Sequence, residues 1–100
     1  MLRLLALVLA AGVLAVPALA AVPSAVPAKA NRVASVYVNR FGITYPPSAW
    51  HASCRPVVGL PRAWRCAVRT NTGQCKGTLR IIRRLTGRLV ARRIHIGCGE

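Results

Sequence analysis

Acidic residues are almost absent from this chain of 100 residues. It contains no aspartate, and Glu100 is its single glutamate. Paired-carboxylate glycoside hydrolysis, a complete Ser-His-Asp triad and a carboxylate site for magnesium or calcium all need several acidic side chains. The composition excludes these classes, and we expect a protein that is not an enzyme and that uses no cofactor or metal.

Histidine offers two further routes to chemistry. A His-x-x-Cys spacing occurs at His51 with Cys54 and again at His95 with Cys98. In a β-strand, residues three apart point to opposite faces, so neither pair could chelate one ion while extended. A basic nuclease could instead use two histidines and a lysine. We expect these histidines on the two outermost strands, about 14 Å apart in a flat sheet and too distant to share one phosphate unless the sheet curls strongly.

The first 20 residues have the layout of a secretory signal peptide. Arg3 gives the positive start, residues 4–16 form an apolar run, and Ala18-Leu19-Ala20 is a small-residue cleavage site. The alternative is an uncleaved membrane anchor, since the apolar stretch approaches the ~20 residues of a spanning helix. Pro17 and the Ala-Leu-Ala site favour cleavage after Ala20, and the small residues at positions 26–30 offer later cleavage sites as an alternative. We expect a signal peptide at 1–20, an Ala- and Pro-rich spacer at 21–29, and a secreted product that lacks a transmembrane segment.

The remaining domain, residues 30–100, is close to the size limit below which a hydrophobic core needs covalent support. It contains all four cysteines, Cys54, Cys66, Cys75 and Cys98. An even number in an exported chain indicates disulfide bonds, and four cysteines allow three pairings. Each bond would stabilise the domain by roughly 3 kcal/mol.

Apolar periodicity predicts a helix followed by strands. From Pro27 to Phe41, apolar residues recur at three- and four-residue steps, and Gly42 follows as a C-terminal cap. The helical apolar positions are Ala30, Val33, Ala34, Tyr37 and Phe41. From Ala49 the period changes to two, which predicts strands at about 49–56, 63–70, 75–84 and 88–98. The expected fold class is α+β, with one N-terminal amphipathic helix packed on a four-stranded antiparallel meander and two disulfides.

Turn chemistry fixes a strand register. Tight turns at Thr72-Gly73 and Thr86-Gly87, with a longer loop centred near Leu60, set Cys54 opposite Cys66 and Cys75 opposite Cys98. We therefore prefer these two pairs. The same register puts one apolar face against the helix: Trp64, Cys66, Val68, Cys75, Leu79, Ile81, Val90, Ile94, Ile96 and Cys98. Arg92 does not fit this face, so a bulge or a one-residue slip in the last strand is an alternative.

The opposite face of the predicted sheet is basic. The chain has 15 Lys and Arg residues and a net charge of +14, and of these cations only Arg3 precedes residue 21. In the expected register Arg55, Arg65, Arg80 and Arg93 form a row about 14 Å long. Like charges directly opposite one another destabilise a sheet, so a bound anion is a natural counter-charge. The alternative is a merely solvated basic face. The predicted anion-binding residues are Arg55, Arg65, Arg69, Lys76, Arg80 and Arg93.

Charge-driven binding is the function that this composition favours. Aromatic residues that could stack on bases are few, which argues against sequence-specific recognition of nucleic acid. We expect the partner to be an anionic polymer or surface: a nucleic acid backbone, a glycan, a cell-wall polymer or an anionic lipid. The alternative from another class is a secreted protease inhibitor that presents the loop between Cys54 and Cys66. A plain hairpin connection explains the same segment.

Overall fold

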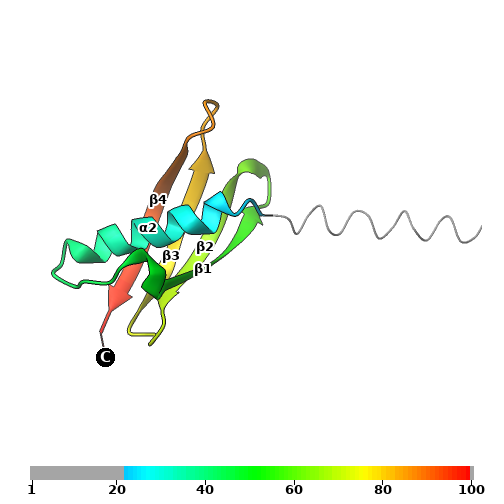
Figure 1. The fold of residues 1–100 in the computed structure, drawn as a ribbon. Helices are drawn as coiled ribbons and strands as arrows, with labels where there is room; N and C mark the ends of the chain where they lie inside the picture. Colours follow the sequence, from blue (N-terminus) through cyan, green and yellow to red (C-terminus); the bar gives the residue numbers. More distant parts are fainter. Residues whose placement is uncertain (1–21, 100) are drawn as a thin grey trace, which may run out of the picture.

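The structure, a computed structural model, describes residues 22–99. In this part of the chain one helix precedes an antiparallel sheet with the strand order β1-β2-β3-β4 (Figure 1). The elements are α2 (Ala25–Asn39), the 3-10 helix η1 (Pro47–Ala49), β1 (Trp50–Val57), β2 (Leu60–Thr70), β3 (Cys75–Arg83) and β4 (Leu89–Cys98). The predicted fold class is confirmed. The expected signal peptide, residues 1–20, lies outside the described residues.

Helix α2 packs on one face of the sheet through small side chains. Val26, Ala30, Ala34 and Val38 recur every four residues, and each is at most 2% exposed. This spacing aligns them on one side of the helix, and the alanines let its backbone approach the sheet closely. The helix begins at Ala25, two residues before the predicted start. A part of the expected spacer therefore contributes to the core.

The C-terminal end of the helix differs from the prediction at Phe41. The backbone N–H of Phe41 donates to the carbonyl of Val38 in a turn beyond the last helical residue. Gly42, with a φ of 84°, then redirects the chain. Because the helix ends before Phe41, its side chain is 68% exposed and packs edge-on against Tyr37. Val38 occupies the core in its place.

Two of the three strand connections are the predicted tight turns. Gly73 and Gly87 have φ angles of 78° and 94°, the left-handed region that glycine adopts without strain. The β1–β2 connection is shorter than the predicted loop around Leu60. Val57 pairs with Leu60, so Val58 and Gly59 alone make the turn. Because Pro56 pairs with Trp64, residues 61–63 of β2 form an irregularity opposite the step from Pro56 to Val57.

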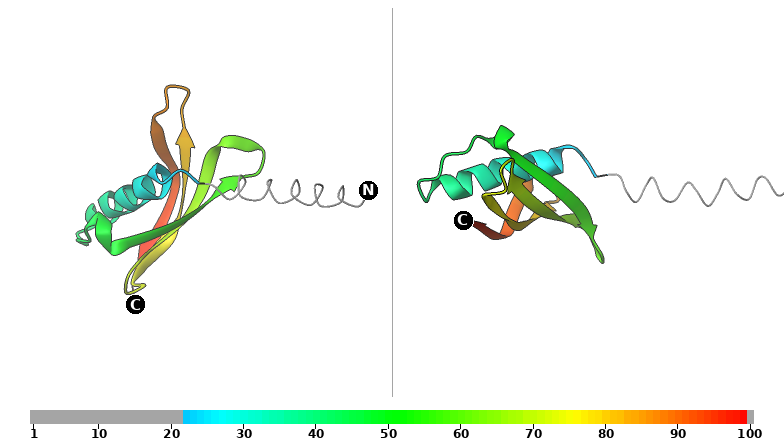
Figure 2. Two further views of the ribbon diagram at one scale, coloured as in Figure 1. Left: turned by 45° about the vertical axis from the view of Figure 1, so that its right-hand side comes forward. Right: turned by 90° about the horizontal axis from the view of Figure 1, so that it is seen from below.

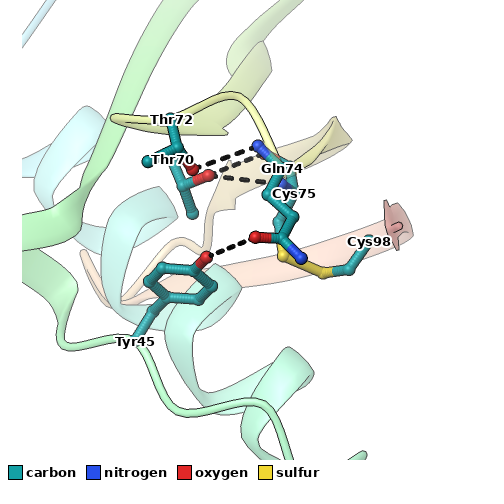
Figure 3. Close-up of a disulfide and its surroundings, with 6 residues drawn as sticks. All are labelled: Tyr45, Thr70, Thr72, Gln74, Cys75 and Cys98. Carbon is teal, nitrogen blue, oxygen red and sulfur yellow. Dashed lines mark hydrogen bonds between the residues drawn. A yellow bond between two sulfur atoms is a disulfide. The ribbon is translucent and has the colours of Figure 1, made fainter. Parts of the chain in front are cut away.

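Both predicted disulfides are present. Cys54 pairs with Cys66 and Cys75 with Cys98 across neighbouring strands, with a Cα–Cα distance of 4.0 Å in each pair. Figure 3 shows the Cys75–Cys98 bond beside the β2–β3 turn. There the buried hydroxyl of Thr70 accepts a hydrogen bond of 3.2 Å from the backbone N–H of Cys75. Cys75 is thus bonded to β4 through its disulfide and to the end of β2 through this hydrogen bond.

Tyr45 ties the segment between α2 and the sheet to this turn. Its hydroxyl donates to the side-chain oxygen of Gln74 at 3.3 Å (Figure 3). The buried hydroxyl of Ser35 in α2 donates to the backbone carbonyl of Tyr45. Tyr45 is therefore hydrogen-bonded to both α2 and the β2–β3 turn, which links the helix to the sheet.

The covered face, the side of the sheet under α2, holds most of the predicted core. Buried there are Trp64, Cys66, Val68, Cys75, Leu79 and Ile81, and Ile94, Ile96 and Cys98 pack against them. The prediction for Val90 is wrong. The β3–β4 register shifts between Thr78 and Arg80, so Ala91 pairs with Ile81 and packs against the core instead.

The sheet is strongly twisted. Figure 2 shows that the tips of the β1–β2 and β3–β4 hairpins point in different directions, with α2 on one side only. Among residues 22–99 nothing packs over the other side, and this uncovered surface carries most of the strand arginines.

Candidate anion-binding face

The open face, the side of the sheet turned away from α2, carries seven cationic side chains. In β1, β2 and β3, Arg55 pairs with Arg65 and Arg65 pairs with Arg80. Directly opposed residues point to the same face, so three guanidinium groups follow one another across the strands. This part of the predicted row is confirmed. The seven cations are Arg55, Arg65, Arg69, Lys76, Arg80, Arg92 and Arg93.

The fourth member of the row is Arg92, and the predicted pairing of Arg80 with Arg93 is wrong. Thr78 pairs with His95, as expected, but Arg80 pairs with Arg92, so β4 contains a bulge between these pairs. Arg93 is one of the bulged residues. Its φ of 52° lies in the left-handed region, which residues other than glycine rarely adopt.

This bulge has a physical cause in the sequence. Without it, strict alternation would direct Arg92 to the covered face, where no carboxylate among residues 22–99 could pair with it. The left-handed conformation of Arg93 costs on the order of 1 kcal/mol, far less than burial of an unpaired guanidinium. The result is that Arg92 and Arg93 both lie on the open face. The misfit of Arg92 in the alternating pattern was the sequence signal for it.

A small pocket collects cations from three strands. It has a volume of about 110 Å³ and lies where β2, β3 and β4 meet around the bulge. Guanidinium groups can bind phosphate, sulfate or carboxylate with two parallel hydrogen bonds, and an imidazole can add one more. Because residues 22–99 contain no Asp or Glu, no acidic side chain of this region can occupy the pocket. Its lining residues are Arg65, Thr78, Leu79, Arg80, Arg93 and His95.

A second cationic row lies further along the strands. Arg69 pairs with Lys76, and His51 pairs with Arg69 on its other side. All three side chains are exposed. The imidazole of His51 is hydrogen-bonded to the side-chain oxygen of Asn71. The predicted residues Arg69 and Lys76 therefore belong to the open face but not to the arginine row or its pocket.

The fold keeps the two histidines apart. His51 is in β1 and His95 in β4, the edge strands of the sheet, with β2 and β3 between them. Their sequence neighbours Cys54 and Cys98 are each bonded to another cysteine. Within the described residues no three His, Cys, Asp or Glu side chains are grouped to hold a metal ion. The two histidines therefore do not lie on neighbouring strands.

All five aromatic residues lie away from the open face. Trp50 and Trp64 are buried in the core, and Tyr37 and Tyr45 pack against it. Phe41 lies just beyond the end of α2. The open face therefore offers no ring on which a nucleic acid base could stack.

The segment considered for protease inhibition is the end of the β1–β2 hairpin. Strand pairing continues to Val57 and Leu60, and Val58 at the tip is 98% exposed. The segment is thus a hairpin connection that extends the sheet.

Comparison of the chain with protein-family models, curated proteins and solved structures finds no match. The geometry and charge of the open face are therefore the basis on which a function can be proposed.

Proposed function

We propose that this protein is an exported, non-catalytic basic protein that binds anionic polymers or surfaces through its open face. The observation that carries the proposal is the pocket shared by Arg65, Arg80 and Arg93. Opposed like charges destabilise a sheet, and no acid among residues 22–99 offsets them. An anion bound there removes the repulsion and gains charge-assisted hydrogen bonds.

The distribution of charge supports the open face as the binding surface. Of the 15 Lys and Arg residues, 14 follow Arg3, and seven of these 14 lie on this one face. Apolar packing uses the other face, so the cations can engage a ligand without loss of core contacts. A cationic surface of one sign also speeds the approach of a polyanion at low salt.

Two disulfides are compatible with an oxidising, extracellular location. Residues 22–99 include no helix with the length and apolarity of a membrane span. Mass spectrometry of the exported protein under non-reducing conditions tests this part of the proposal. We expect a mature chain that starts after Ala20, with both disulfides intact. A protein retained in the cell with residues 1–20 attached contradicts it.

Heparin chromatography tests the binding face. The double variant Arg65→Gln with Arg80→Gln removes two cations from the arginine row, and Arg32→Gln with Arg40→Gln removes two exposed cations from the α2 region. Both double variants lower the net charge equally. We expect the salt concentration at elution to fall much further for the first, because two fewer ionic contacts release fewer counterions on binding.

Two outcomes would contradict the proposal. If the unmodified protein shows no salt-sensitive retention on heparin, the protein does not bind polyanions and the whole proposal is contradicted. Equal shifts for the two double variants would assign retention to total charge, and the open face would then have no special role.

A further inference from the structure

A row of small side chains separates the two cationic rows of the open face. Ser53, Ala67 and Thr78 are consecutive register partners across β1, β2 and β3, and all three are exposed. On one side of them lies the arginine row, and on the other lie Arg69 and Lys76. Short side chains between long ones leave a trough that runs across the strands.

The register determines the width of this trough. Residues on one face of a strand repeat at about 6.8 Å, so the two cationic rows are roughly 14 Å apart. The part over β1, β2 and β3 has a volume of about 470 Å³ and is lined by residues 51–53, 67–69 and 76–78. The arginine pocket shares Thr78 with it. Trough and pocket thus adjoin at β3, and the pocket forms the β4 end.

Charge and shape together select a class of ligand. Arg69 and Lys76 line the trough on one side, and by register the arginine row lies beyond the uncharged floor on the other, so a fitting ligand is a narrow chain with anionic groups on both sides. A B-DNA duplex is broader than the roughly 14 Å between the two cationic rows, so it can rest on the rows but not enter the trough. Single-stranded nucleic acid gains affinity from stacking on aromatic rings, and all five rings of this protein lie elsewhere. The hydroxyl groups of Ser53 and Thr78 can hydrogen-bond to sugar hydroxyls, and the methyl group of Ala67 can contact a sugar C–H surface.

We propose that the trough binds one extended chain of an anionic polysaccharide across the strands. Its sulfate or carboxylate groups alternate between the cationic rows, and one of them occupies the pocket of Arg65, Arg80 and Arg93. This inference rests on the proposed function and adds the ligand class and its path across the sheet.

Filling the trough tests this assignment without a change in charge. Ala67→Phe puts a ring on the floor at an exposed strand position, where aromatic residues are well tolerated. The probes are a short heparin oligosaccharide and a DNA duplex, measured by titration calorimetry at the same salt concentration. We expect at least a 10-fold loss of affinity for the oligosaccharide and less than a 2-fold change for the duplex, which rests on the cationic walls. Leu85→Phe, at the exposed β3–β4 turn, is the matched control and should change neither affinity.

The outcomes separate the trough from the general binding proposal. Unchanged oligosaccharide affinity in Ala67→Phe overturns the trough while polyanion binding stands, and so does an equal loss for both probes. Failure of the unmodified protein to bind either probe overturns the proposed function itself. A single-stranded oligonucleotide that binds more tightly than the oligosaccharide, and is displaced by the same variant, overturns the choice of ligand. Thr78→Phe fills the same trough from β3 and provides the test if Ala67→Phe does not fold.

Discussion

The two faces of the sheet are built from the same strands but have opposite roles. On β3, Ile81 is fully buried beneath α2, whereas its neighbour Arg80 points to the open face and lines the anion pocket. Alternation along a strand thus places a core residue and a candidate ligand-binding residue side by side. Stability and binding should therefore separate by face, and substitutions at neighbouring positions can test the separation.

The largest contrast is expected between Ile81→Ala and Arg80→Ala. Loss of the buried Ile81 side chain leaves a cavity and should lower the free energy of unfolding by about 2–5 kcal/mol. Arg80→Ala should change it by less than about 0.5 kcal/mol, because this residue opposes other cations and packs outside the core. Guanidinium chloride unfolding of both variants, with disulfides intact, measures the contrast. Equal destabilisation would show that the faces are not independent.

Removal of one disulfide should have the next largest effect on stability. Cys75→Ser with Cys98→Ser opens a bond with a sequence separation of 23, and Cys54→Ser with Cys66→Ser one with a separation of 12. The chain-entropy model gives about 3 kcal/mol for each, slightly more for the longer loop. Urea unfolding of the two double variants measures both values. A smaller loss for the Cys75–Cys98 pair would contradict the loop-length explanation.

Gly77→Ala should weaken both faces together. A Cβ at Gly77 would overlap the backbone of β4 at His95 and Ile96, so β3 and β4 must move apart. We expect a loss of about 1–3 kcal/mol in stability, the usual range for overpacking, together with weaker heparin retention because His95 lines the pocket. Gly97→Ala is the control, since an added Cβ there contacts nothing. Thermal unfolding and heparin chromatography of the Gly77→Ala and Gly97→Ala variants measure both properties. A Gly77→Ala variant that loses stability but keeps its heparin retention would contradict the prediction.

The smallest predicted effect concerns an arginine on the covered side. The guanidinium carbon of Arg83 lies 5.3 Å from the ring centroid of Trp64, a cation–π contact worth about 0.5–1 kcal/mol. Arg83→Gln should lose this stabilisation, whereas the exposed neighbour Arg84 should tolerate the same change. Thermal unfolding distinguishes them. Both variants lose one charge outside the open face, so their heparin retention should shift equally.

Much of the sheet could be predicted because its signals are local. Glycines at positions 73 and 87 supply left-handed turns, and two-residue periodicity assigns side chains to faces. Together these fix the register up to Thr78 and His95, and with it both disulfides. Arg55, Arg65 and Arg80 follow from the same register. These features need no knowledge of how distant parts of the chain pack.

The features that were missed depend on packing between elements. Phe41 lies outside the core because the helix ends at Asn39, two residues before it. Where the helix ends depends on whether the chain continues α2 or reverses at Gly42. The β1–β2 turn closes at Val58-Gly59 because the strands continue to pair beyond Pro56. Neither balance is encoded in periodicity alone.

The sequence by itself determined a helix before an antiparallel meander, the two disulfide pairs and a strongly cationic chain without acidic partners. Only the tertiary structure decided that Arg92 pairs with Arg80 and joins Arg93 on the open face. The bulge in β4 exists because α2 and the core make the covered face unavailable to Arg92, so the backbone at Arg93 adopts a left-handed conformation. That choice depends on the free energy of burying a charge under a helix distant in sequence, and it adds Arg92 to the open face beside Arg93.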